Sequence, residues 1–211
     1  MRRTAGCTLL SLATLWGCSS TVLVPVPPRM ELKDYGTIGV VEFSSNYTPA
    51  VNARATREFQ ARIHAAQPGT RLVELGSREA LLAVVGSRQL DPEALKNIGA
   101  KHGVDAIFLG EIAYSEPKTN INVTSMSKLE GSARSDIRGD IASRLVETRT
   151  GAAVWSSSAW ATRQVGRVEV SARQGVSTTM RDSDVRDDMV PALVFHLTED
   201  FRPGTVRQKV R

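Results

Sequence analysis

The chain has 211 residues, of which 41% are hydrophobic and 23% charged, and its formal net charge is +5 at pH 7. These proportions are those of an ordinary globular protein. The basic residues are scattered along the chain rather than clustered. A nucleic-acid partner is therefore not expected from the net charge. Only two cysteines are present, Cys7 and Cys18. Their positions exclude a cysteine-based metal site or nucleophile in the folded part of the chain.

The N-terminus has the layout of a secretory signal. Two arginines precede an apolar run at 9–16, which is too short to be a stable membrane span. The run ends in Leu-Trp-Gly-Cys, which resembles the lipobox of bacterial lipoproteins except for the bulky Trp16. The resemblance implies cleavage between Gly17 and Cys18 and acylation of Cys18, so a covalent lipid is expected and no cofactor. The alternative is an ordinary signal peptide (1–17) with an incidental cysteine.

Residues 18–34 are expected to be the acylated anchor and a short tether, in which prolines favour an extended form. Ser19 is not the Asp that marks inner-membrane retention in enterobacterial lipoproteins. An outer-membrane location, lipid-anchored and facing the periplasm, is therefore expected by resemblance. Nothing after Cys18 is long and apolar enough to be a transmembrane helix, so membrane contact would come through acyl chains.

The first half of the chain predicts strands alternating with helices. Thr48 and Pro49 form an N-cap followed by proline at the first helical position, and apolar residues then recur every four positions. Similar start signals stand at Ser77 and at Asp91-Pro92. The expected elements are strands at 37–43, 71–75 and 104–112 and helices that begin at Thr48, Ser77 and Asp91. This alternation predicts an α/β layer.

In the second half of the chain, polar and apolar residues alternate at 121–126, 136–148 and 153–162. This pattern predicts antiparallel strands with one solvent-exposed face. A hairpin turn is expected at 147–151, where Gly151 is free to take a positive φ. Residues 165–180 are a weaker segment, either one more hairpin or a mobile loop.

The last helix is expected to begin at Ser183 or Asp184 and to end before Arg202-Pro203-Gly204, leaving a basic tail at 203–211. Its predicted buried stripe consists of Val185, Met189, Leu193, Leu197 and Phe201. The fold class expected is α/β (α+β). A single three-layer-type domain at 35–202 would hold a mixed sheet, helices packed on it, an antiparallel second half and a C-terminal helix.

Catalytic and metal-binding patterns are missing from the sequence. His64, His102 and His196 have no second histidine or carboxylate at metal-ligand spacing. No nucleophile motif stands in a suitable setting, so neither catalytic nor metal residues are expected and the protein is not expected to be an enzyme. Trp155 and Trp160 are the candidate partner surface. Their alternative role is packing in the core and at the sheet edge.

Three stretches carry a resemblance to a known superfamily: Ile-Gly-Val-Val-Glu-Phe at 38–43, Gly-Val-Asp-Ala-Ile-Phe-Leu-Gly-Glu-Ile at 103–112, and Ser-Arg-Leu-Val-Glu-Thr-Arg-Thr-Gly-Ala-Ala-Val-Trp-Ser at 143–156. They are similar to the superfamily that holds the curli-secretion lipoprotein CsgG, the penicillin-binding-protein activator LpoB and the N-terminal domain of TolB. The likeness covers most of 35–202. Its motifs are structural, so they imply a fold and transfer no catalytic residue.

The resemblance implies a non-enzymatic envelope lipoprotein that acts as an assembly or interaction module for another envelope protein. The alternative is a subunit of an oligomeric outer-membrane secretion channel of the curli type. In such a channel each subunit contributes long amphipathic hairpins to a barrel. The corresponding stretches here, 117–136 and 161–183, are expected to be too short and too charged, because Arg167 and Arg173 interrupt the alternating apolar residues. A long tether like that of the synthase activator is not expected either, since residues 19–33 are too few.

Overall fold

The computed structural model describes residues 20–125, 130–171, 175–180 and 185–210. The chain divides into two compact units, one spanning 27–203 and a smaller one in which residues 20–26 pair with 204–210. In chain order the larger unit contains η1 (Lys33–Tyr35), β2 (Thr37–Val41), β3 (Ser44–Ser45), α1 (Pro49–Ala66), β4 (Arg71–Gly76), α2 (Arg78–Val85), α3 (Pro92–His102), β5 (Ala106–Tyr114), β6 (Lys118–Ser125), β7 (Glu130–Glu147), β8 (Ala153–Ser171), β9 (Gly175–Met180), α4 (Val185–Leu197) and η2 (Glu199–Phe201).

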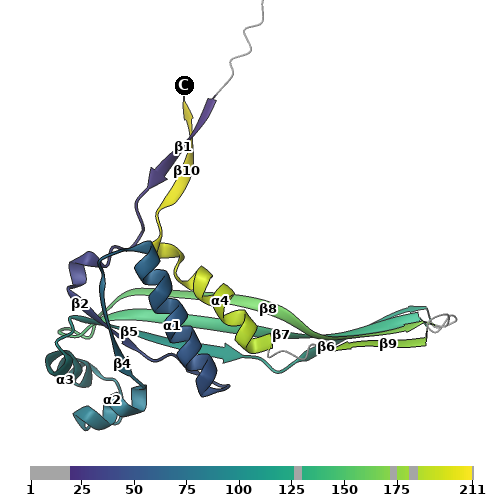
Figure 1. The fold of residues 1–211 in the computed structure, drawn as a ribbon, viewed down its shortest axis with the longest axis horizontal. Coiled ribbons are helices and arrows are strands. Elements are labelled where there is room, and N and C mark those ends of the chain that lie inside the picture. Colours follow the sequence, from purple (N-terminus) through teal and green to yellow (C-terminus); the bar gives the residue numbers. More distant parts are fainter. Residues whose placement is uncertain (1–19, 126–129, 172–174, 181–184, 211) are drawn as a thin grey trace, which may run out of the picture. The chain divides into compact units, whose positions relative to one another are not determined.

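The sheet of the larger unit is mixed, with the strand order β4-β2-β5-β7-β8-β9 (Figure 1). β2 runs parallel to both β4 and β5, whereas β5, β7, β8 and β9 pair antiparallel. β3 adds to β5, and β6 adds to the far half of β7. The predicted change from an α/β first half to an antiparallel second half is therefore confirmed.

The three helices predicted in the first half begin where their capping residues predicted. The side chains of Thr48, Ser77 and Asp91 each accept a hydrogen bond from the backbone amide three residues further on. Each bond satisfies one of the amides that a helix start leaves without a partner. Gly103 ends α3 with a φ of 64°, a left-handed conformation that favours glycine.

The sheet separates two hydrophobic clusters, because successive residues of a strand point to opposite faces. On the face covered by α1 and α4, the ring of Phe108 lies 5.0 Å from that of Phe59 and 5.8 Å from those of Trp155 and Phe201, measured between centroids. On the other face, Ile107 packs with residues of α2 and α3. These three layers confirm the predicted fold class.

The closing helix α4 buries the predicted stripe, with Val185, Met189, Leu193 and Leu197 in the core and Phe201 following in η2. Its predicted first residues, Ser183 and Asp184, lie outside the described residues. Asp187 in the first turn forms an ion pair with Arg54 of α1, which joins the two helices on one face of the sheet.

The ordered domain begins earlier than the predicted boundary at residue 35. Leu32 is fully buried in the cluster beneath α1 and α4. Its amide donates to the side chain of Gln67, at 2.7 Å, and the same side chain donates to the carbonyl of Met30. The last part of the predicted tether is therefore packed on the domain.

The antiparallel half is longer than predicted. β7 and β8 stay paired from Val146 and Ala153 to Gly131 and Val170, and β6 and β9 flank their outer parts. We call this outer part the strand extension; it comprises residues 118–125, 130–136, 166–171 and 175–180. None of the helices in the described part of the chain lies over it (Figure 1). Residues 165–180 thus contain one more hairpin, the first of the two predicted alternatives.

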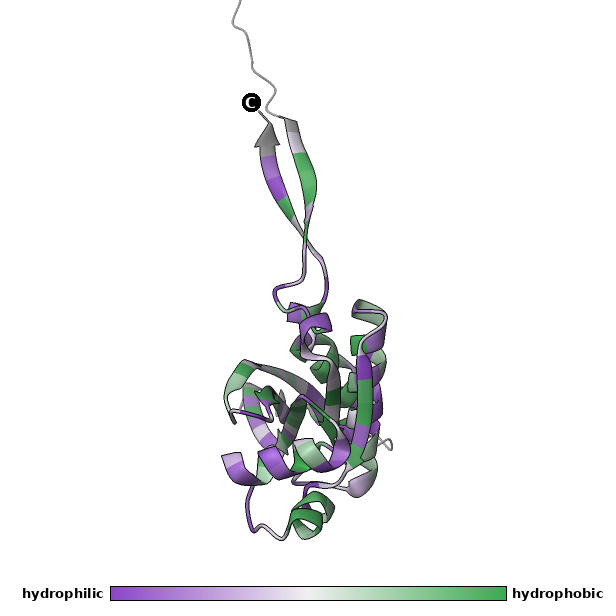
Figure 2. Ribbon diagram, turned by 90° about the vertical axis from the view of Figure 1, so that its left-hand side faces the viewer, coloured by the Kyte–Doolittle hydropathy of each residue, from purple (hydrophilic) through white to green (hydrophobic). Residues whose placement is uncertain are grey.

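The smaller unit is a two-stranded antiparallel sheet of β1 (Ser20–Val26) and β10 (Gly204–Val210). Its register pairs Ser20 with Val210 and Val26 with Gly204. β1 is largely hydrophobic, and β10 carries hydrophilic residues (Figure 2). The predicted tether and basic tail therefore pair with each other, which the separate sequence patterns did not suggest.

Gly110 in β5 provides a test of the packing on the α1 and α4 face. A Cβ added at Gly110 would lie 2.2 Å from the ring of Phe43, which is buried. We expect Gly110→Ala to lower the free energy of unfolding by roughly 1–3 kcal/mol, because the ring must shift. The control is Gly166→Ala, where the nearest atom lies 3.8 Å away; it should change stability by less than about 0.5 kcal/mol. Equal urea midpoints for the two variants would contradict this packing.

Candidate functional site

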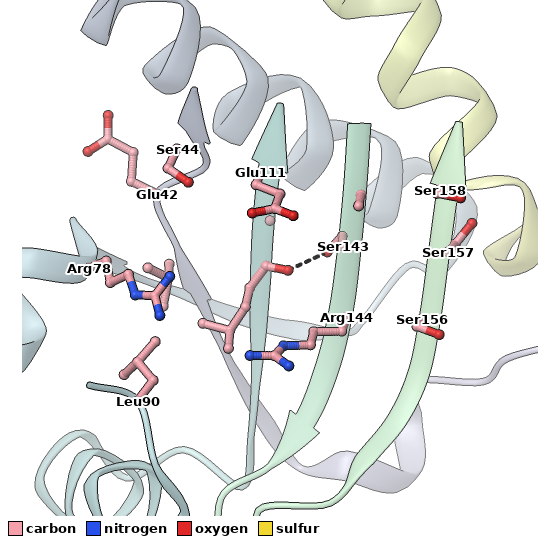
Figure 3. A pocket seen from close by; sticks show the side chains of 14 residues that line it. Glu42, Ser44, Arg78, Leu90, Glu111, Ser143, Arg144, Ser156, Ser157 and Ser158 are labelled. Atoms are coloured by element: carbon pink, nitrogen blue, oxygen red, sulfur yellow. Dashed lines mark hydrogen bonds between the residues drawn. The ribbon is translucent and has the colours of Figure 1, made fainter. Parts of the chain in front are cut away.

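An open groove of about 610 Å³ lies on the face of the sheet opposite α1 and α4 (Figure 3). Its floor consists of adjacent segments of three strands, 109–111 of β5, 142–144 of β7 and 156–158 of β8. Arg78, the first residue of α2, and Leu90 close one side. The groove exists because α2 and α3 cover only part of this face of the sheet.

Four charged side chains line the groove, Arg78 and Arg144 together with Glu42 and Glu111. Among the described residues, none of the four forms an ion pair with another protein side chain. The guanidinium of Arg144 points toward the middle of the groove, and that of Arg78 faces it from the α2 side (Figure 3). Two charges of each sign favour a polar ligand with both signs of charge over a polyanion.

Serine hydroxyls supply most of the remaining polarity. Ser156 and Ser158 of β8 lie in register with Arg144 and Ala142 on the groove face, whereas Ser157 and Ser143 occupy the alternate positions and Ser143 donates to the carbonyl of Leu109 at 3.1 Å. No histidine lines the groove, so its serines have no imidazole base beside them. The groove can therefore hold a polar ligand by hydrogen bonds.

The three histidines are far from forming one site. His64, His102 and His196 lie on α1, α3 and α4 and are exposed. Within the described ranges, no group of three or more His, Cys, Asp or Glu side chains is placed to hold a metal ion.

The two tryptophans of the predicted partner surface lie on opposite faces of the sheet. Trp155 is 9% exposed, packs against Phe201 and donates from Nε1 to Asp200 at 3.2 Å. Trp160 is 61% exposed on the other face, where the Arg138 guanidinium lies 4.8 Å from its ring centroid. Hydrogen bonds to Asp140 raise the pKa of that guanidinium. The structure therefore does not bring the two tryptophans together.

The strand extension presents a surface that sequence reasoning missed. One row of its register joins Ile121, Ala133, Val168 and Thr178 across four strands. Ile121 is 76% and Val123 57% exposed. The alternation along β7 runs unbroken from this row to Ile137 and Ile141, which are buried beneath the helices. The apolar face of the extension thus continues the core face beyond the helices that cover it.

The expectation that Arg167 breaks this pattern was wrong. Arg167 pairs with Arg134 and Thr179, one position along from the row of Val168. Neighbouring residues of a strand point to opposite faces, so Arg167 lies on the polar face, with Asn120 in the same row. Arg173 lies outside the described residues. The signal that could have shown this face was the alternation in β6, where Ile121 and Val123 stand between asparagines and threonines.

The proposed lipidation and cleavage positions, Cys18 and Gly17, precede the first described residue. In the parts of the chain that the structure describes, no helix has the length and hydropathy needed to cross a membrane.

Comparisons with known proteins found distant likenesses. No family model and no curated protein matches the chain. Among solved structures, the PelC dodecamer from Paraburkholderia phytofirmans is 12% identical with a TM-score of 0.42, covering 87% of this chain and 98% of its own. Lipoprotein GNA1162 from Neisseria meningitidis is 15% identical (TM-score 0.35, 61% and 83% covered). The LpoB C-terminal domain from Salmonella enterica is 13% identical (0.36, 60% and 83%).

These solved structures thus include one lipoprotein, GNA1162, and the C-terminal domain of LpoB, a protein that the sequence resemblance named. Likenesses at these identities and TM-scores carry no argument about activity or partner.

The opposite placement of the two tryptophans can be measured. We expect Trp155→Ala to lower the free energy of unfolding by about 3–5 kcal/mol, because it removes a largely buried ring that packs against Phe108 and Phe201. Trp160→Ala removes an exposed ring and should cost less than about 1 kcal/mol. Urea denaturation followed by circular dichroism gives both values. A larger loss for Trp160→Ala would contradict the assignment of faces.

Proposed function

We propose that the protein is a lipid-anchored envelope lipoprotein, facing the periplasm, that acts as a non-enzymatic assembly or interaction module for another envelope protein. The observation that carries the proposal is the uncovered apolar face of the strand extension, with Ile121 and Val123 at its exposed positions. Exposed apolar surface of this kind, on a face that continues a protein core, is typical of a contact surface.

The energetics favour a partner on one face only. Complete burial of a Val or Ile side chain contributes about 1.5–3 kcal/mol, so a partner covering Ile121 and Val123 would gain from both. Asn120, Asn122 and Arg134 occupy the opposite face and are exposed, as suits a face in water. The described residues of the extension include none of the buried core. Its apolar face is therefore available for contact.

The proposed anchor is Cys18, acylated after cleavage behind Gly17. The arginine-led apolar run and the Leu-Trp-Gly-Cys ending at 15–18 support it. Ser19 after the anchor supports the outer membrane, with the domain on the periplasmic side. No cofactor other than the covalent lipid, no nucleic-acid partner and no catalytic residue is proposed.

A second candidate is an oligomeric outer-membrane secretion-channel subunit, in which the partner is another copy of the chain. It is favoured by the strand extension, because both hairpins alternate and, among the side chains that the structure describes there, the charged ones of Lys118, Arg134, Asp136 and Arg167 share one face. It stays second because, in the described part of the chain, β6 has 8 residues and β9 has 6, fewer than the ~9–11 that a spanning strand needs.

The anchor is tested by Cys18→Ala. This variant should leave the membrane fraction, because the unacylated chain loses the methylenes that hold it, each worth about 0.8 kcal/mol when buried. Cys7→Ala is the matched control and should stay membrane-bound, since Cys7 is removed with the signal. Immunoblots of carbonate-washed membranes give the readout. Persistence of Cys18→Ala in the washed membranes would refute the anchor.

The contact face is tested by a photo-crosslinking amino acid placed at Ile121 or at Asn122 in the full acylated chain in cells. These neighbours are both exposed and point to opposite faces. We expect a crosslinked product from position 121 and far less from position 122. Equal yields at the two positions would contradict the proposal.

The mass of the crosslinked product and of the protein in mild detergent separates the two candidates. A product that contains a different envelope protein, with a monomeric or dimeric chain by light scattering, supports the interaction module. A product made only of this chain, with a ring of many subunits in detergent, would make the channel the better candidate.

A further inference from the structure

The pairing of β1 with β10 places the C-terminal residues beside the proposed anchor. We call this two-stranded sheet the terminal ribbon. Ser20, which pairs with Val210, follows Cys18 by two positions. Two residues of chain span at most about 7 Å. Arg207 and Lys209, which occupy the register positions opposite Leu23 and Thr21, are therefore brought close to the point where acyl chains would enter the bilayer.

The terminal ribbon has two unlike faces. Val22, Val24 and Val26 alternate along β1, and Val206 pairs with Val24 on the same face. The other face carries Thr21, Leu23 and Arg207. The two strands contain no acidic residue, and their charged residues, Arg207 and Lys209 of β10, are both basic. One face is thus formed largely of valine, and the other holds a cation.

The terminal ribbon has no core of its own. Val22 is 48% and Val206 50% exposed, and none of the described side chains of either strand is buried. A pair of strands without a covered face is at best marginally stable in water. A surface that takes up the valine face would stabilise it, and Arg207 favours a surface that bears negative charge.

We propose that the terminal ribbon lies on an anionic bilayer surface, with its valine face toward the acyl chains, as a second membrane contact beside acylated Cys18. An amphipathic element at the interface buries its apolar face near the boundary of headgroups and chains, while cations meet anionic headgroups. The inference rests on the lipid anchor of the proposed function. It assigns the C-terminal tail a role as part of the membrane attachment.

Spin labels on the full acylated chain test this placement. Cys18 is the one cysteine of residues 18–211 and is blocked by acylation, so Val22→Cys and Leu23→Cys can each be labelled alone. The protein is bound to vesicles of phosphatidylethanolamine and phosphatidylglycerol, and the accessibility of each label to a water-soluble nickel chelate is measured. We expect several-fold lower accessibility at position 22 than at position 23. High and equal accessibility at both positions would overturn the proposal.

A charge reversal tests the contribution of the basic residues. Arg207→Glu with Lys209→Glu should raise the nickel accessibility of the label at position 22 toward that at position 23. Arg88→Glu with Lys96→Glu is the matched control: both are exposed residues of the larger unit, and the change in net charge is the same. An equal rise with the control pair, or none with the Arg207 and Lys209 pair, would overturn the role of charge complementarity.

Vesicle flotation separates failure of the anchor from failure of the terminal ribbon. If the acylated protein does not float with vesicles, the proposed lipid anchor is refuted, and so is the proposal for the terminal ribbon, which rests on it. If the protein floats and the two labels are equally accessible, only the ribbon proposal falls.

Discussion

The antiparallel pairing of β7 with β8 is the constraint on which the larger unit depends. Its ladder runs from Gly131 to Val146 and passes through two regions. One region is covered by helices of the described chain and the other is not (Figure 1). Near the turn at 147–151 it belongs to a three-layer core, and near its far end it belongs to the strand extension. The register shifts between Ser135 and Asp136, just beyond Ile137, the last buried residue of β7 in that direction. An irregularity at such a boundary increases the local twist of the strands.

The continuity of this ladder explains where the uncovered apolar face of the strand extension arises. Along β7, alternate residues stay on one face, so the face that is buried under α1 and α4 at Ile141 continues past these helices at Ala133. At Ile141 that face is covered by helices, and at Ile121 in the neighbouring β6 nothing in the described chain covers it. The opposite face carries the groove between Arg78 and Arg144. The two faces thus offer different chemistry, apolar contact on one and hydrogen bonding on the other.

Much of the fold was predictable because its signals are local. The capping side chains of Thr48, Ser77 and Asp91 act on amides three residues away, and such contacts are read directly from a short window. The same holds for the stripe of α4. The candidate site was less predictable. Trp155 and Trp160 are predicted from the sequence to form one surface, although five positions along a regular strand place them on opposite faces. Arg167 is also predicted to interrupt an apolar run, which in the structure lies on the other face.

The sequence by itself predicted the strands at 37–43, 71–75 and 104–112 and the helix starts at Thr48, Ser77 and Asp91, and it has the layout expected of a secretory signal at 1–17. These depend on hydrophobic periodicity, caps and composition, which involve residues close together in the chain. Only the tertiary structure decided that residues 20–26 pair with 204–210, that Leu32 joins the core, and that the apolar face extends past the helices. Each of these depends on contacts between segments far apart in the chain, whose register no local pattern contains.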